Sequence, residues 1–198
     1  MTTNGIKFKL KIIAFNGSPR KGGNTELLLR EAIKPLTEAG HETIVYPLNE
    51  MKIKPCQDCD CCRQTGTCLY QDDMTGIYEA IREADRIILA SPVFFYNLSA
   101  QAKTMVDRCQ VFWCEKYLKK NPVPAGPRGR RGLLLLVGGM KKDDTLQCAG
   151  LTAKAFFRSI SVPVHETLAY GGVDGKGEVA DHPTAFQEVY EAGKRLMT

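Results

Sequence analysis

The sequence contains no run of about 20 apolar residues, the length that an α-helix needs to cross a bilayer. Residues 1–13 carry lysines but no apolar stretch followed by a small-residue cleavage site, as a secretory leader would. These absences predict a soluble, cytoplasmic protein with no membrane partner. There is also no internal repeat, and low complexity is confined to a Pro-, Gly- and Arg-rich stretch at 121–131.

A long basic stripe is missing as well. The net charge is +5, but the lysines and arginines form short clusters at 7–11, 116–120 and 128–131. Nucleic-acid binding needs a continuous basic surface with stacking or base-reading groups, so we expect no nucleic-acid partner. The charge suits an anionic cofactor or an acidic electron-transfer partner better. The three histidines lie far apart in the sequence and match no metal-ligand spacing.

Apolar runs alternate with helical patterns along the chain, which is 198 residues long and 43% hydrophobic. Strands are predicted at 9–15, 43–48, 86–90, 132–137 and 164–170, and helices at 25–39, 73–84, 99–113, 145–160 and 183–197. Continuous apolar strands separated by helices are typical of a parallel sheet with helices on both faces. We therefore predict one α/β domain over residues 1–198, with a doubly wound, flavodoxin-like sheet in the order 2-1-3-4-5.

The loop after the first predicted strand, residues 16–25, has the composition of a phosphate site. Ser18 and Thr25 offer hydroxyl groups, Arg20 offers charge, and Gly22 and Gly23 let the backbone approach a ligand. The loop runs into a helix, whose N-terminal N–H groups favour anions. Its spacing matches neither the GxGxxG nor the Walker pattern, which disfavours dinucleotides and nucleoside triphosphates. A loop that only connects strand and helix is the alternative.

A second loop, residues 91–97, follows the third predicted strand and reads SPVFFYN. It should lie beside the phosphate loop, because the carboxyl ends of neighbouring parallel strands meet at one edge of the sheet. Its proline and three aromatic residues could lie along a flat ring system, although they could also cap the core. A phosphate loop beside a ring-contacting loop points to flavin mononucleotide (FMN).

The segments GSPRKGGNTELLL (17–29) and SPVFFYNLSAQAKTMVDRC (91–109) resemble the signature segments of the NADPH-dependent FMN reductase family, especially its iron–sulfur flavoproteins. The resemblance runs from about residue 9 to residue 170 and implies a flavin-dependent oxidoreductase. It implies phosphate contacts from Ser18, Arg20, Asn24 and Thr25, close to Gly23. For the flavin ring it implies contacts from Pro92, Val93, Phe94, Phe95 and Asn97, with Gly138 and Gly139 bordering the ring.

Five of the eight cysteines lie within residues 56–68, in a cysteine-rich loop predicted at 54–72 after the second strand. Cys56, Cys59, Cys62 and Cys68 give the spacing C-x2-C-x2-C-x5-C. In the reducing cytosol, clustered cysteines hold metals or do redox work more often than they form disulfides. Four thiolates suit a [4Fe–4S] cluster. The spacing also resembles the compact motif of iron–sulfur flavoproteins.

Other interpretations of this loop stay open. Four cysteines could hold structural zinc, although zinc sites usually pair two C-x2-C knuckles across a longer spacer. The thiols could also be free or disulfide-linked, with no metal. Cys61 could replace its neighbour Cys62 as a ligand, although the spacing favours Cys62. Cys109, Cys114 and Cys148 are predicted to be buried and inert.

Three functions follow from these patterns. The first is electron transfer between a [4Fe–4S] cluster and FMN, with ferredoxin or NAD(P)H as donor and a small molecule as acceptor. The second is a cluster-free NAD(P)H-dependent reductase of flavin or quinone. The third is a non-enzymatic flavin or metal redox sensor. Because a flavin carries its own chemistry, no catalytic side chain is predicted. The resemblance implies a homodimer or homotetramer, in which the cluster of one subunit can face the flavin of another.

Overall fold

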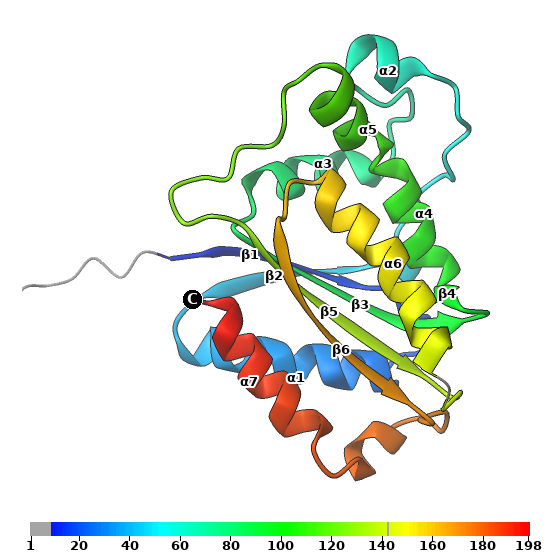
Figure 1. Ribbon diagram of the computed structural model, residues 1–198, viewed down its shortest axis with the longest axis vertical. Helices are drawn as coiled ribbons and strands as arrows, with labels where there is room; N and C mark the ends of the chain where they lie inside the picture. The colour runs from blue at the N-terminus through cyan, green and yellow to red at the C-terminus, as the bar shows by residue number, and fades with distance from the viewer. Residues whose placement is uncertain (1–8, 142) are drawn as a thin grey trace, which may run out of the picture.

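A parallel sheet forms the centre of the computed structural model, which describes residues 9–141 and 143–198 (Figure 1). Its five parallel strands follow the order β2-β1-β3-β5-β6. A short additional strand, β4, is antiparallel and pairs with β3. The strands are β1 (Lys11–Asn16), β2 (Glu42–Pro47), β3 (Arg86–Phe94), β4 (Asn97–Leu98), β5 (Arg131–Gly138) and β6 (Val164–Gly171). Residues 1–8 and 142 of the predicted domain lie outside the described residues.

The five parallel strands confirm the flavodoxin-like order 2-1-3-4-5 when they are counted along the chain. Strands β1, β3 and β5 are buried over most of their length, as their continuous apolar runs predict. The edge strands β2 and β6 are more exposed and carry more polar residues. The apolar pattern thus set both the strand positions and the centre of the sheet.

Helices cover both faces of the sheet, as expected (Figure 1). Helices α1 and α7 pack on one face and share a core with Leu28, Leu36 and Val189. Helices α3, α4 and α6 pack on the other face, with Met74, Met105 and Phe156 among the buried side chains. The helices are α1 (Asn24–Glu38), α2 (Cys61–Thr65), α3 (Met74–Glu83), α4 (Ala100–Arg108), α5 (Gln110–Trp113), α6 (Asp143–Ser159) and α7 (Ala185–Leu196). Within the two described ranges, no helix combines the length and apolarity that a membrane span requires.

The third strand continues beyond its predicted end at Ala90. It passes through Ser91 and Pro92 to Phe94 and turns back into β4, where Val93 pairs with Leu98. Proline is tolerated here because the pairing with β1 ends at Ala90, so β3 has only β5 beside it at Pro92. The turn places Phe95 and Tyr96 at φ values of 47° and 64°.

The helices differ from their predicted bounds, most of them by only one or two residues at an end. Helix α1 begins at Asn24, one residue before its predicted start, with Gly23 as its N-cap. The helix predicted at 99–113 ends at Arg108, and α5 then continues into a π-helical segment, Cys114–Leu118. Short 3-10 turns complete the fold at Leu48–Glu50 and Glu178–Asp181.

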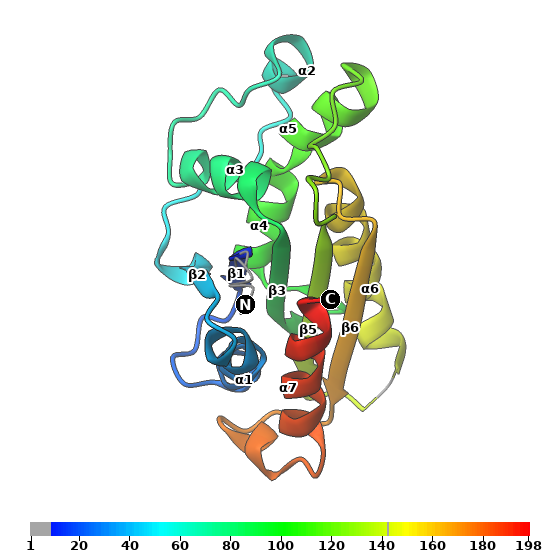
Figure 2. The same cartoon turned by 90° about the vertical axis from the view of Figure 1, so that its left-hand side faces the viewer.

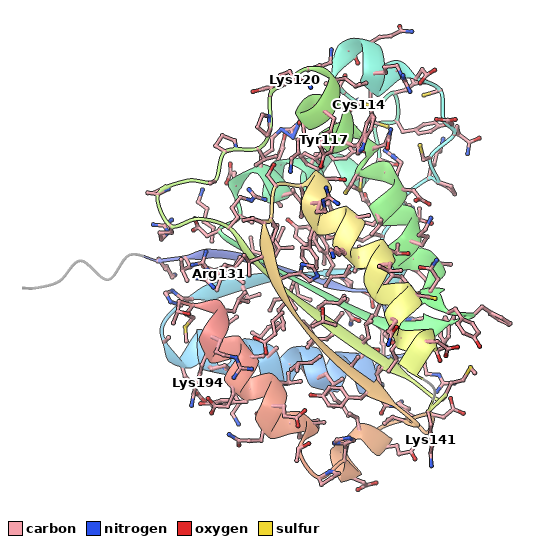
Figure 3. The ribbon with its side chains drawn as sticks, in the orientation of Figure 1. Cys114, Tyr117, Lys120, Arg131, Lys141 and Lys194 are labelled. Carbon is pink, nitrogen blue, oxygen red and sulfur yellow. The ribbon has the colours of Figure 1, made fainter. Side chains whose placement is uncertain are left out.

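The cysteine-rich loop leaves the sheet after β2 and includes the short helix α2, in a stretch that the sequence predicted to be irregular. Both views show α2 and α5 beside each other at one end of the molecule, beyond the carboxyl end of α6 (Figures 1 and 2). The same end carries Cys114, Tyr117 and Lys120 (Figure 3). Lys119 Nζ donates a hydrogen bond of 2.9 Å to the Gln64 carbonyl and so fastens the loop to the π-helical segment.

Candidate functional sites

A pocket lies at the carboxyl ends of β1, β3, β5 and β6, where ligands bind in doubly wound sheets. Most of the residues predicted for the cofactor line it. From the phosphate loop these are Ser18, Arg20, Gly23, Asn24 and Thr25, and from the other two loops Pro92, Val93, Phe94, Gly138 and Gly139.

The phosphate loop is shaped by its own polar groups. The Ser18 N–H donates to Asn16 Oδ1 at 3.0 Å, and the Arg20 N–H donates to Ser18 Oγ at 3.2 Å. Gly22 has a φ of 65° and donates its N–H to Glu26 Oε2 at 2.7 Å. Because Gly23 has no side chain to cap α1, the N–H groups of the first helical turn stay available for an anion.

Asn24 makes two contacts that the sequence did not indicate. Its amide nitrogen donates to the Gly175 carbonyl at 2.8 Å, and its oxygen accepts from the Val179 N–H at 3.2 Å. Both ends of this side chain therefore hold the loop after β6 against the start of α1. Asn24 still lines the pocket, but its printed contacts are to the protein itself.

Three further lining residues, Val173, Asp174 and Lys176, are absent from the set predicted above. They belong to the glycine-rich loop after β6, which the Arg20 guanidinium approaches with a 3.4 Å hydrogen bond to the Asp174 carbonyl. Lys176 brings a second cation to the phosphate end. The signal was present in the sequence, because the fifth parallel strand must end at the same edge as the first.

Part of the segment 91–97, at the end of β3 and in the turn that follows, lines the pocket. Pro92, Val93 and Phe94 line the pocket, and a Cβ at Gly138 would lie 3.4 Å from Val93 Cβ. Phe95 is fully exposed, and Asn97 Oδ1 accepts a hydrogen bond from the Leu98 N–H. Neither Phe95 nor Asn97 is among the described residues that line the pocket.

The residues present fit FMN. A helix N-terminus with two nearby cations, Arg20 and Lys176, suits a phosphate group. The backbone and aliphatic surfaces of Val93, Gly138 and Val173 suit a flat ring. A Cβ at Gly139 would lie 3.1 Å from Asp174, so glycine keeps this side of the pocket open.

A second pocket collects the thiols of the cysteine-rich loop. Cys56, Cys59, Cys62 and Cys68 line it, together with Cys114 from the π-helical segment. Cys62 Sγ lies 3.7 Å from Cys114 Sγ. Burial raises the pKa of the Cys62 thiol to about 12, and the contact with Cys114 adds to the shift.

Cys61 lies outside the group of described residues that line this pocket, and its Sγ is 3.7 Å from Thr65 Oγ1. Cys114 is buried, as expected, and the fold brings it to Cys62 across 52 residues. Cys148 is exposed rather than buried, whereas Cys109 is buried as expected. Cys114 carried no signal in the sequence, since its position depends on where α5 ends.

Four cysteines of the loop line one pocket, which matches the number of thiolates that a [4Fe–4S] cluster takes. Within residues 9–141 and 143–198, no three His, Cys, Asp or Glu side chains are arranged to hold one metal ion. A cubane cluster takes its four thiolates on four different irons and so at wider separations than one zinc ion does. The pocket wall also contains Arg108, whose Nε is buried without a hydrogen-bond partner among the described residues.

An α/β sheet of this order, with an anion-binding loop after its first strand, defines the class of flavodoxin-like proteins. The sequence profile of the NADPH-dependent FMN reductase family matches residues 10–155. The chain belongs to this family and, within it, to the iron–sulfur flavoproteins. The family is described as one of NADPH-dependent FMN reductases, and several relatives are named iron–sulfur flavoproteins.

Two curated relatives support the assignment to the iron–sulfur flavoproteins. An iron–sulfur flavoprotein of Methanocaldococcus jannaschii is 44% identical over 99 residues, which are 50% of this chain and 51% of that protein. One of Methanosarcina thermophila is 37% identical over 141 residues, 70% of each protein. The alignment therefore spans about half of the first relative and about two thirds of the second.

The fold has solved counterparts. An FMN-dependent NADH-azoreductase of Bacillus anthracis, solved in complex with FMN, superimposes with a TM-score of 0.70 at 15% identity. The match covers 94% of this chain and 99% of that one. At this identity the likeness shows the shared fold.

Proposed function

We propose that the chain transfers electrons between a [4Fe–4S] cluster in the cysteine pocket and FMN at the carboxyl edge of the sheet. The observation that carries this proposal is the second pocket, in which four cysteines spaced C-x2-C-x2-C-x5-C share one cavity. We further propose that residues 1–198 act as one domain and that residues 54–72 form its cluster-binding loop.

In the flavin pocket, we assign the phosphate to Ser18, Arg20, Gly23, Asn24 and Thr25. Arg20 and Lys176 supply positive charge, and the open N-terminus of α1 supplies N–H donors. We assign the ring to Pro92, Val93 and Phe94 on one side and to Gly138 and Gly139 on another. The family resemblance also assigns Phe95 and Asn97 to the ring; both lie in or next to the turn beside the pocket.

In the cysteine pocket, we assign the cluster to Cys56, Cys59, Cys62 and Cys68. A bound [4Fe–4S] cluster would exchange single electrons, and FMN exchanges one or two. The protein excludes water through the buried side of the pocket, where Cys114 and Arg108 are each 1% exposed. Cys56 and Cys59 are exposed and leave an open side through which a redox partner could approach.

The two pockets share no lining residue in the described parts of the chain. Helix α4 runs between them, and its nine residues span roughly 13 Å. A neighbouring subunit could bring its flavin closer to the cluster, so we propose a homodimer or homotetramer as the working unit. NAD(P)H or a ferredoxin-like protein would supply electrons, and a small molecule would accept them.

The test is the content of iron, acid-labile sulfide, zinc and FMN in protein purified without oxygen. About four irons and four sulfides per chain beside one FMN would support the proposal. Zinc in place of iron, or neither metal after anaerobic reconstitution, would overturn the cluster assignment.

A cluster-free NAD(P)H-dependent reductase of flavin or quinone is the second candidate. It is favoured by the composition of the flavin pocket, because none of the described residues that line this pocket is a cysteine. Steady-state assays separate the two functions. Replacement of the four assigned ligands, Cys56, Cys59, Cys62 and Cys68, by serine would leave NAD(P)H oxidation unchanged in a cluster-free reductase and abolish electron transfer in the cluster protein.

A further inference from the structure

A buried arginine forms part of the wall of the cysteine pocket. Arg108 is the last residue of α4, its side chain is 1% exposed, and it lines the pocket together with Cys62 and Cys68. Aspartates 58 and 60 also line the pocket, and both are exposed. Of the lining residues that the structure describes, Arg108 is the one permanent cation.

Both terminal nitrogens of Arg108 donate hydrogen bonds to the protein. Nη1 donates to Asp72 Oδ2 at 2.7 Å and to the Lys54 carbonyl at 2.7 Å, and Nη2 donates to Asp72 Oδ1 at 3.1 Å. The ring of Tyr70 lies 5.3 Å from Arg108 Cζ. These contacts fix the guanidinium in one orientation, with the Asp72 carboxylate at its Nη edge.

The N–H of the third nitrogen, Nε, has no partner among the residues that the structure describes, although it is shielded from solvent. A buried donor without an acceptor is costly and signals a missing partner at that point. Burial alone would lower the pKa of Arg108, but the hydrogen bond with Asp72 raises it on balance, so the group stays charged. Burial also raises the pKa of the nearby Tyr78 phenol, which is therefore neutral.

We propose that Arg108 is the internal counter-charge and N–H donor for the sulfur atoms gathered in the cysteine pocket. It would thereby raise the reduction potential of the cluster. The inference rests on the proposed function, because it needs a cluster in this pocket. A cluster with four thiolates is anionic and gains another negative charge on reduction. A fixed cation and a hydrogen bond to sulfur therefore stabilise the reduced state more than the oxidised one.

The test compares the cluster potential of Arg108→Gln with that of the unchanged protein, by EPR-monitored titration under anaerobic conditions. We expect the equilibrium to shift at least tenfold toward the oxidised cluster, which is about 59 mV for one electron. Arg63→Gln is the matched control, because Arg63 lies in the cysteine-rich loop next to Cys62 but its side chain is 57% exposed. An intact Arg108→Gln cluster with an unchanged potential, or an equal shift in the control, would overturn the inference.

A second measurement needs no substitution. Protein labelled with 15N at arginine Nε should show a 15N hyperfine coupling in the EPR spectrum of the reduced cluster, and Arg63→Gln should retain it. Absence of this coupling would overturn the role of Arg108 even if Arg108→Gln does not fold. Iron and sulfide in the unchanged protein are measured first. Their absence would refute the proposed function itself, and with it the inference, whereas a cluster without the coupling refutes the role of Arg108 alone.

Discussion

Cys61 and Cys62 are adjacent in the sequence, yet their thiols have different surroundings. Cys62 Sγ lies beside Cys114 in the pocket, and Cys61 Sγ lies beside Thr65 on α2. Successive residues of an α-helix point in directions about 100° apart, so only one of the two can face the pocket. We expect Cys62→Ser to lose most of its iron and sulfide, and Cys61→Ser to retain both, in analyses of anaerobic protein.

Cys114 is the fifth cysteine of the pocket, and a double variant tests whether it can replace a missing ligand. If Cys62→Ser keeps four irons but loses them when Cys114→Ser is added, Cys114 has replaced the missing ligand. If Cys61→Ser is the variant that loses iron, the assignment of Cys62 is wrong. Circular dichroism of each variant would separate ligand loss from loss of fold.

Arg20 offers a test of the phosphate assignment. Its guanidinium lines the flavin pocket, and a charge-assisted hydrogen bond contributes about 1.5–3 kcal/mol. Because Arg20 is exposed, we expect the lower end of this range, so that Arg20→Gln raises the Kd for FMN by roughly tenfold. Flavin fluorescence quenching would measure it. Riboflavin lacks the phosphate and should bind both proteins equally; an equal loss for both flavins would contradict the assignment.

At the residue scale, the sequence was informative where one local segment makes the site. Ser18, Arg20 and Thr25 follow a strand and precede a helix, so their convergence is a local property. Lys176 and Cys114 come from segments whose positions depend on the assembled sheet and on the end of α5. Asn24 lines the expected pocket, but its amide is used by a loop about 150 residues away, which no local pattern reveals.

Among the elements, α1 and α7 approach each other unusually closely at Gly193. A Cβ added there would lie 2.3 Å from the Ala32 carbonyl oxygen and 2.7 Å from Pro35 Cγ. Pro35 remains inside α1, and its ring fills the space that Gly193 leaves open. Gly193→Ala must therefore push the two helices apart. We expect a loss of about 1–3 kcal/mol in the free energy of unfolding, measured by urea denaturation.

Gly76 is the control for this substitution. It lies within α3, and a Cβ there would meet nothing within 4 Å. Gly76→Ala should stabilise the protein by roughly 0.5–1 kcal/mol, because alanine loses less conformational entropy in a helix. A neutral or stabilising effect of Gly193→Ala would show that α1 and α7 can separate at no cost.

Elements with a continuous apolar run were predictable, because β1, β3 and β5 are buried on both faces and need nothing but apolar residues. The turn at Phe95 and Tyr96 was not predictable. Asn-Gly or Asp-Gly would be the usual signal for such a turn, and aromatic residues rarely adopt positive φ. The break of the long helix at Cys109 was equally hidden, since no glycine or proline marks it.

At the scale of the whole molecule, the two sites use different parts of one architecture. The flavin pocket uses the carboxyl edge of the sheet, where the doubly wound topology opens a crevice. The cysteine pocket uses a loop and the end of α5, outside the sheet. Ser99 connects them, because it caps α4 and donates a 2.6 Å hydrogen bond to the Gly17 carbonyl in the phosphate loop.

At the amino edge of the sheet, Asp85 connects several elements of the fold. Its carboxylate accepts hydrogen bonds from the Lys11 N–H at 2.9 Å and from Arg128 at 2.8 Å. Its backbone carbonyl accepts from Arg86, whose Nε also donates to the Leu196 carbonyl at the end of α7. One buried aspartate thus connects β1, β3, the loop before β5 and, through Arg86, α7.

This arrangement predicts how stability depends on pH. Burial would raise the pKa of Asp85, but the hydrogen bond with Arg128 lowers it on balance, below the value near 3.9 of an unfolded chain. The charged carboxylate therefore stabilises the fold above about pH 4, and this contribution is lost as the pH falls through the folded-state pKa. Asp85→Asn should cost about 1–3 kcal/mol at pH 7 in urea denaturation, and the difference from the unchanged protein should shrink toward pH 3. Glu83→Gln removes an exposed partner of Lys11 and should change stability by less than about 0.5 kcal/mol at either pH. A cost for Asp85→Asn that stays constant from pH 7 to pH 3 would mean that side-chain shape, rather than charge, holds this edge of the sheet together.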